Sequence, residues 1–262
     1  MDRDPEASAR ARLLQQEFGR SLRFVEGDFA DCGIQIAGLA RGEAPLDGAL
    51  LDLGLSSFQL QDPTRGFSFS TDGPLDMRFS PHQSTSAAEV VNRYPEERLR
   101  QVIFTLGQES WAGRIAAAIV RQRQKAPLLT TFALAELVRR AIPRARWPRR
   151  IHPATRTFQA LRIEVNQELD SLRRGLEEIA RHTRPGGRFG VIAFHSLEDK
   201  VVKDFLNVEA KNCICPPRQP VCVCGHKAML RVLTPHPIRP VADEIGLNPR
   251  SRSARLRVGE RL

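Results

Sequence analysis

The chain has 262 residues, long enough for one large domain or two small ones, and its hydrophobic content of 41% and charged content of 27% are typical of a globular protein. It has no apolar run long enough to cross a bilayer and no N-terminal signal segment, so we expect a cytosolic protein without a membrane partner. The net charge of +10 favours a nucleic acid partner, although only five of the 40 basic residues are Lys, and genomic base composition alone can produce such an excess of Arg.

The first part of the chain alternates helices and strands. Asp4 is a suitable N-cap and Pro5 a suitable first-turn residue, which predicts a helix from Pro5 to Phe18. A strand, a weaker helix and a buried strand are predicted next, at 22–25, 32–39 and 48–51. This order is typical of the doubly wound parallel sheet of an α/β protein.

Acidic residues lie at two of the predicted strand ends. Asp2 is placed like the acid that binds ribose hydroxyls in dinucleotide-binding folds, and Asp28 with Phe29 could hold an adenine through its amino group and its ring. A charge near a helix N-terminus explains Asp2 as well, and a turn acid with a core ring explains Asp28 and Phe29.

Asp52 ends the strand at 48–51 and opens a long polar loop that runs to Arg78. A strand that delivers a carboxylate into a loop at its carboxyl end is how an open α/β sheet presents a site. Asp52, followed by Ser56 and Ser57, could accept hydrogen bonds from an amine. A serine hydrolase is disfavoured, because the second glycine of its nucleophile elbow is replaced by Phe58.

Helices replace the alternation between residues 80 and 150, which resembles an inserted domain. Apolar spacing predicts helices at 87–94, 96–106, 109–124 and 131–142. The block ends in an arginine-rich stretch at 139–150, and Arg with an interleaved aromatic suits phosphate contacts and base stacking. The candidate RNA contacts here are Arg146, Trp147, Arg149 and Arg150. A solvated helix end explains the same pattern equally well.

The α/β alternation resumes after residue 150. One long helix is predicted from about Pro153 to Thr183, then a strand at 188–194 and a helix with Ser196 as its N-cap. His195, Ser196 and the acids after them cannot form a local catalytic triad, because adjacent residues do not face one another, although His195 could line a site. The domains expected are 1–79 and 151–262 for the α/β part and 80–150 for the insertion.

Four of the five cysteines fall within twelve residues, Cys213, Cys215, Cys222 and Cys224. In a cytosolic protein such a cluster predicts a metal site before disulfides, and four thiolates suffice for a structural zinc ion. The paired cysteines are one residue apart rather than the usual two or more, and free thiols in a surface loop are the alternative.

The tail contains two predicted strands, at 229–233 and 254–258, which can pair antiparallel. Between them, Arg250 and Arg252 are further candidate contacts to RNA phosphates.

Several segments together resemble the RsmH (MraW) family of S-adenosylmethionine-dependent methyltransferases, over residues 1–262. They are DGALLDLGLSSFQLQDPTRGFSFSTDGPLDMR, HPATRTFQALRIEVNQEL, RPGGRFGVIAFHSLEDKVVKDF and NPRSRSARLR. The resemblance implies a class I, Rossmann-like methyltransferase domain with a helical substrate-recognition insertion. It also implies N4-methylation of a cytidine of 16S ribosomal RNA, near the decoding centre of the small subunit.

By position, the resemblance implies S-adenosylmethionine contacts at Asp2, Phe29, Asp52 and Gln59, beside which Asp28 is also a candidate. Asp2 would bind the ribose hydroxyls and Phe29 the adenine, while Asp52 and Gln59 would lie near the methionine end and the target amine. We expect Asp52, Ser56 and Ser57 to hold that amine so that its lone pair faces the methyl group. The sequence identifies no dedicated general base.

The chain departs from the family at Phe58, where Pro is usual, at Gln108, where Glu is usual, and at its start. A glycine-rich cofactor loop and a first strand precede Asp2 in the family, so we expect this chain to be a truncated gene model of a full enzyme. If the chain is made as given, we expect an unpaired apolar edge on the strand that ends at Asp52, and weak or no cofactor binding. A non-catalytic RNA-binding or ribosome-assembly protein is the alternative function. A DNA cytosine methyltransferase is disfavoured, because 52–55 lacks the DPPY-type signature. The sequence leaves a homodimer open.

Overall fold

The computed structural model describes residues 1–39, 46–217, 219 and 221–262, which form two compact units. The first unit combines both ends of the chain, Met1–Gly54 and Leu169–Leu262, and the second is the continuous middle, Leu55–Glu168. Within the described residues, no helix has the length and apolar character that crossing a membrane requires.

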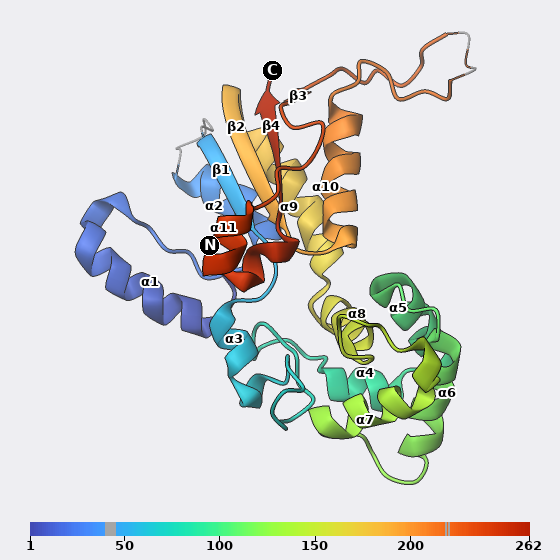
Figure 1. Cartoon of the computed structure of the whole chain (residues 1–262). Coiled ribbons are helices and arrows are strands. Elements are labelled where there is room, and N and C mark those ends of the chain that lie inside the picture. The colour runs from blue at the N-terminus through green and yellow to red at the C-terminus, as the bar shows by residue number, and fades with distance from the viewer. Residues whose placement is uncertain (40–45, 218, 220) are drawn as a thin grey trace. The chain divides into compact units, whose positions relative to one another are not determined.

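A four-stranded sheet is the frame of the first unit (Figure 1). Its strands are β1 (Leu46–Asp52), β2 (Thr183–Ala193), β3 (Leu230–Val232) and β4 (Arg255–Arg261). The strand order is β1-β2-β4-β3, with β1 parallel to β2 and with β4 antiparallel to both β2 and β3. The sheet is therefore mixed, and its parallel pair joins strands from the two ends of the chain.

The first unit buries apolar side chains between its helices and this sheet. The described helices are α1 (Pro5–Phe18), α2 (Cys32–Leu39), α9 (Glu168–His182), α10 (Ser196–Glu209) and α11 (Ala242–Leu247). Leu176 of α9, Phe189 of β2 and Leu206 of α10 are almost fully buried in one cluster, and burial of each contributes about 2 kcal/mol. The predicted helices at 5–18 and 32–39 are confirmed, with Asp4 as the N-cap of α1.

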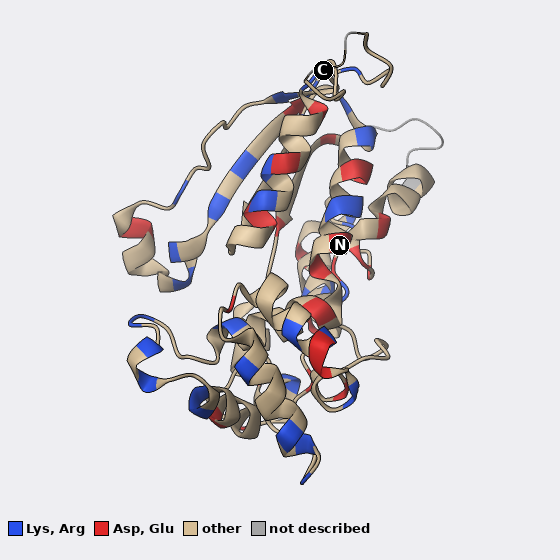
Figure 2. Ribbon diagram, turned by 90° about the vertical axis from the view of Figure 1, so that its right-hand side faces the viewer, with Lys and Arg blue, Asp and Glu red and all other residues tan. Residues whose placement is uncertain are grey.

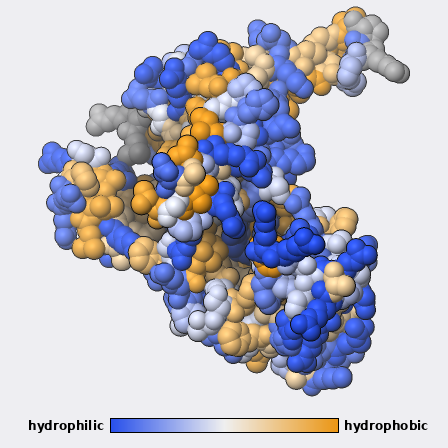
Figure 3. All heavy atoms as spheres, viewed as in Figure 1, coloured by the Kyte–Doolittle hydropathy of each residue, from blue (hydrophilic) through white to orange (hydrophobic). Residues whose placement is uncertain are grey.

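β1 is less buried than its apolar sequence predicts. Leu51 packs in the core, but Leu50 is 68% exposed, and Figure 3 shows hydrophobic side chains at the surface over β1. Among the described strands only β2 pairs with β1, so no strand covers its other edge. An exposed apolar edge of this kind favours association of chains through strand pairing.

The strand predicted at 22–25 is wrong. This stretch keeps one isolated parallel bridge, between Asp2 and Glu26, in which the Asp2 N–H donates to the Val25 carbonyl at 3.2 Å. A strand needs a neighbour along its length to pair its backbone groups. Here the neighbouring segment turns into α1 after Asp4, so the pairing ends after a single bridge.

The second unit is a helical bundle that incorporates the polar loop after Asp52. Its helices are α3 (Ser57–Gln61), α4 (Ala87–Arg93), α5 (Glu96–Gly107), α6 (Ala112–Arg123), α7 (Thr131–Ala141) and α8 (Thr155–Asn166). Phe67, Leu75 and Met77 of the loop are buried in the same core as these helices. The compact unit therefore begins earlier and ends later than the 80–150 segment predicted as an insertion.

The single helix predicted over 153–183 is wrong, because the chain breaks between α8 and α9. Gln167 adopts a left-handed conformation with φ 51° and ends α8. Asn166 next to it is fixed by three hydrogen bonds: its amide donates to the Met77 and Arg162 carbonyls, at 2.7 and 2.9 Å, and accepts from the Phe79 N–H at 2.8 Å. The apolar stripe continues through both helices, which is why the spacing alone did not reveal the break.

Candidate active site

Asp52 stands where the parallel pair of strands ends. The pairing of β1 with β2 continues one residue further, since the Leu53 N–H donates to the Ile192 carbonyl at 3.0 Å. At Gly54 the chain turns away with φ 93°, a conformation that is cheap only for glycine, and a Cβ there would lie 3.4 Å from the Phe194 ring. The strand and the turn thus hold the Asp52 carboxylate at the carboxyl edge of the sheet, where α/β folds place their ligands.

The electrostatic setting of Asp52 is unusual for an accessible acid. Partial burial, and next the negative charge of Glu198, raise the pKa of Asp52 above its usual value. A carboxylate that is reachable from solvent and yet has a perturbed pKa is a candidate functional group. Asp52 can therefore accept a hydrogen bond from an amine and is also better placed than an ordinary Asp to take a proton.

Glu198 is a functional candidate that the sequence did not single out. It is 2% exposed, and its Oε2 accepts from the N–H groups of Phe194 and His195 at 2.9 and 3.2 Å. His195, not the predicted Ser196, is the N-cap of α10, and its Nδ1 accepts from the Glu198 N–H at 3.3 Å. The carboxylate reaches back over the N-cap because the helix begins directly after β2, one residue earlier than a cap at Ser196 predicts.

Asp2 and Asp28 lie on two segments that are joined by hydrogen bonds. The Gly27 N–H donates to the Asp2 carbonyl at 2.9 Å, and Arg3 donates to Asp28 Oδ2 at 2.9 Å. Asp28 also accepts from the Ala30 N–H at 3.0 Å and the Ser171 hydroxyl at 2.8 Å. Asp28 therefore has a structural role as a cap and an ion-pair partner, whereas the carboxylate of Asp2 is exposed and accepts from the Asp4 N–H at 2.9 Å.

Phe29 is held by a close approach to α9. A Cβ at Gly175 would lie 2.5 Å from Cδ2 of Phe29, so only glycine allows the ring to pack against the helix in this way. The ring is half-buried and keeps an exposed part. Asp2 and Phe29 thus offer an accessible carboxylate and an aromatic face, the two groups that suit a ribose and an adenine.

Ser56, Ser57 and Gln59 open α3 in the second unit. Ser56 Oγ accepts from the Gln59 N–H at 3.1 Å, and Gln59 Oε1 accepts from the Ser56 N–H at 2.9 Å. These atoms form a capping box, so part of the hydrogen-bonding capacity of both side chains serves the helix. Gln59 is buried, whereas Ser56 and Ser57 are both exposed, and the Ser56 hydroxyl is already engaged in the cap.

The arginine-rich stretch contains exposed cations around a packed tryptophan. The Trp147 ring is partly buried, its Nε1 donates to the Ile142 carbonyl at 3.1 Å, and Arg139 and Arg144 lie over the ring, 5.2 and 5.9 Å from its centroid. Arg146, Arg149 and Arg150 are exposed, as are Arg250 and Arg252 of the first unit. Figure 2 shows Lys and Arg spread over both units rather than confined to one.

The predicted metal ligands Cys213, Cys215, Cys222 and Cys224 also come together, with all four sulfur atoms within 4.8 Å of one another.

Comparison with known proteins gives a consistent result along the whole chain. The model of the MraW methylase family matches residues 1–262. The ribosomal RNA small subunit methyltransferase H of Thermomicrobium roseum is 53% identical over 264 residues, which cover 100% of this chain and 79% of the relative. The proteins of that name from Pelobacter propionicus and Geobacter sulfurreducens are both 49% identical, over 100% of this chain and 83% of each relative.

The mixed sheet with its flanking helices is consistent with a methyltransferase fold, and methyltransferases of this kind use S-adenosylmethionine. From the match to its full length, the chain belongs to the MraW methylase family of S-adenosylmethionine-dependent methyltransferases.

Proposed function

We propose that this protein methylates the N4 amine of a cytidine in the 16S ribosomal RNA of the small subunit, in the cytoplasm where ribosomal subunits assemble. The observation that carries the proposal is the Asp52 carboxylate, accessible and with a raised pKa at the carboxyl edge of the sheet, in a chain whose relatives are named ribosomal RNA small subunit methyltransferases. The sequence resemblance to the RsmH family supports the cytidine N4 and the decoding centre as the target.

The types of side chain present suit the parts of S-adenosylmethionine that they would bind. An exposed carboxylate at Asp2 suits the ribose hydroxyls, the half-buried ring of Phe29 suits the adenine, and Gln59 is proposed near the methionine end. Asp28 is proposed to act indirectly, because its carboxylate orders the turn before Phe29. When bound, the cofactor supplies an electrophilic methyl group on a sulfonium.

The chemistry left to the protein is mainly positioning. The N4 lone pair of cytosine is delocalised into the ring, so the amine is a weak nucleophile. We propose that Asp52 accepts a hydrogen bond from N4–H and so turns the lone pair toward the methyl group, with Ser56 and Ser57 holding the same amine. As the N–C bond forms, the nitrogen must lose a proton, and a carboxylate with a raised pKa is suited to accept it.

RNA recognition is proposed for the helical segment 80–150 and for the exposed arginines. The cytidine must leave the base stack to reach any pocket, so the protein has to bind the RNA backbone on either side of it. Arg146, Arg149 and Arg150 are exposed, and nothing in the described chain neutralises their charges. Arg250 and Arg252 are proposed as phosphate contacts in the first unit. A structural metal at the four cysteines would support this fold without taking part in methyl transfer.

The direct test is incubation of the protein with unmethylated small subunits and millimolar S-adenosylmethionine, so that weak affinity does not hide turnover. The expected result is N4-methylcytidine in the 16S RNA, identified by mass spectrometry of its nucleosides. Binding of RNA without any methylated cytidine would contradict the proposal and would favour a non-catalytic role. Cofactor binding is measured separately by calorimetry.

Replacing Arg146, Arg149 and Arg150 together with Gln should weaken RNA binding and flatten its salt dependence. Each lost phosphate contact should reduce the slope of log K against log salt by about 0.7–0.9. Arg140→Gln is the control, because the Arg140 charge is already balanced by Glu136, whose carboxylate lies 2.6 Å away. Filter binding at several salt concentrations measures both slopes, and equal slopes for the triple variant and the unchanged protein would count against these contacts.

A further inference from the structure

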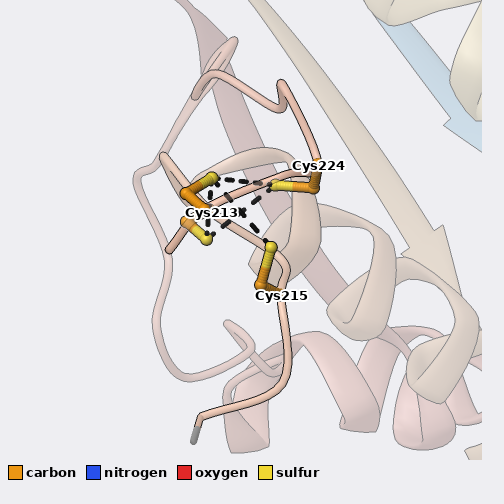
Figure 4. Close-up of side chains that lie close together, drawn as sticks. Cys213, Cys215 and Cys224 are labelled. Atoms are coloured by element: carbon orange, nitrogen blue, oxygen red, sulfur yellow. Dashed lines mark hydrogen bonds between the residues drawn. The ribbon is translucent and has the colours of Figure 1, made fainter. Parts of the chain in front are cut away.

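Four cysteine sulfurs meet in the segment that links α10 to β3. Figure 4 shows Cys213, Cys215 and Cys224 pointing toward one another. The Sγ of Cys222 lies 3.5 Å from that of Cys213, 4.0 Å from that of Cys215 and 3.6 Å from that of Cys224, and the Cys213–Cys224 separation is 3.8 Å. All four are free thiols.

These separations match one tetrahedral metal ion. A Zn²⁺ ion bound to four thiolates at about 2.3 Å requires sulfurs about 3.8 Å apart. The four separations given above span 3.5–4.0 Å, which is centred on that value, and all four sulfurs lie within 4.8 Å of one another. A disulfide would need about 2.05 Å. The cysteines are therefore arranged as the corners of a mononuclear site, although the spacing of one residue between paired cysteines is unusual.

The short spacing is possible because the cysteine side chains of this segment face one another and the apolar side chains between them face solvent. One intervening residue on an extended chain puts both sulfurs on one side and the residue between them on the other. Ile214 and Val223 are accordingly 49% and 75% exposed, while Cys215 and Cys224 are partly buried and Cys213 and Cys222 are exposed. The sulfurs, not the apolar side chains, form the centre of this segment.

Hydrogen bonds join the two ends of the segment, at the end of α10 and just before β3. The Met229 N–H donates to the Glu209 carbonyl at 2.9 Å, and Ala228 N–H donates to Asn212 Oδ1 at 3.3 Å. The part of the segment that carries the cysteines has no comparable ladder of backbone hydrogen bonds among its described residues.

We propose that Cys213, Cys215, Cys222 and Cys224 bind one structural Zn²⁺ ion, which fixes the segment between α10 and β3. Four sulfur ligands in a tetrahedron select zinc over Mg²⁺, Ca²⁺ or Mn²⁺.

The test is elemental analysis of the full chain, purified under reducing conditions and dialysed after zinc loading. We expect about one zinc ion per chain. Replacement by Co²⁺ should give the visible absorption bands of a tetrahedral four-thiolate site. Cys222→Ser removes the sulfur that lies close to all three others, so zinc should fall to a trace and proteolytic cleavage between α10 and β3 should become faster. Cys32→Ala is the control, because Cys32 lies in α2 outside the cluster, and it should keep the metal.

Three results would overturn the site: four titratable thiols that bind no zinc, two disulfides that persist in reductant, or a Cys222→Ser protein with the unchanged cobalt spectrum. One iron ion per chain in place of zinc would overturn the choice of metal. None of these measurements depends on methyl transfer, so the metal site and the proposed function can fail separately.

Discussion

Asp52→Asn is expected to lower methyl transfer by roughly 100-fold or more, the usual cost of losing one group that acts in the transition state. Asn keeps the size of the side chain but is a weaker acceptor for N4–H and cannot take its proton. The rate is measured at saturating cofactor by incorporation of labelled methyl into small subunits. Asp47→Asn is the matched control, because Asp47 lies at the other end of β1, is exposed and pairs only with Arg184 in the described chain.

The same substitution should not destabilise the fold. Burial and Glu198 raise the pKa of Asp52 in the folded protein. The stability that Asp52 contributes is therefore present below its ordinary pKa of 3.8 and is lost as the pH rises through the raised value. At neutral pH, Asn removes this cost, so the unfolding midpoint should stay equal or rise. A variant that loses both activity and stability would show that Asp52 has a structural role instead.

The raised pKa of Asp52 also predicts the acid limb of the pH–rate profile. The ionised carboxylate is the active form, so kcat/KM should fall at a higher pH than an ordinary Asp would give. Glu198→Gln removes a charge that raises the pKa and should move this limb to lower pH. An acid limb that does not move would assign it to another group.

Asp199→Ala is expected to destabilise the first unit by about 3–5 kcal/mol, because it leaves a buried cation without its partner. Asp199 on α10 accepts from Arg257 of β4 at 2.6 Å and from Arg255 at 3.2 Å, and the Arg257 side chain is only 7% exposed. Urea unfolding measures the loss. Asp204→Ala on the same helix is the control, because Asp204 forms an exposed pair with Lys200 and should cost less than about 1 kcal/mol.

A second variant separates the lost pair from a merely damaged helix. Asp199→Ala combined with Arg257→Met replaces the buried pair by apolar groups and should recover most of the lost stability. Burial alone would raise the pKa of Asp199, but the bonds and charges of Arg257 and Arg255 lower it overall. Its stabilisation is therefore present above the ordinary pKa and lost as the pH falls through the lowered one. Failure of the double variant to recover would contradict this account.

The sequence predicted most elements whose signals are local. The Asp4 cap and Pro5 located α1, and three- and four-residue spacing located the helices of the second unit. The wrong predictions concern elements whose structure depends on residues far away in the sequence. The stretch at 22–25 keeps only a single bridge to its neighbour. The helix over 153–183 breaks at Gln167, beside Asn166, whose side chain hydrogen-bonds to a loop far back in the chain. The short helix α11 in a proline-rich link gave no periodic signal.

The candidate site was predictable in part for the same reason. Strand ends and cysteine spacing are local patterns, and they singled out Asp52 and the four cysteines as candidates, whereas Asp28 was assigned to the end of a strand at 22–25 that the structure does not contain. The sequence could not show that Asp28 is occupied by Arg3 and Ser171, or that Trp147 is packed beneath two arginines. The sequence did not single out Glu198, because its effect on Asp52 depends on the pairing of β1 with β2.

The discontinuity of the first unit has a consequence for synthesis on the ribosome. β1 ends at Asp52, and its partner β2 begins at Thr183, after the whole of Leu55–Glu168. The middle of the chain can fold as it emerges, because its contacts lie within one continuous segment, while the first 54 residues must wait for the end. During that interval β1 emerges with its apolar residues unpaired. The nascent chain is therefore vulnerable to misassembly at β1, and slower elongation through the middle would lengthen that exposure.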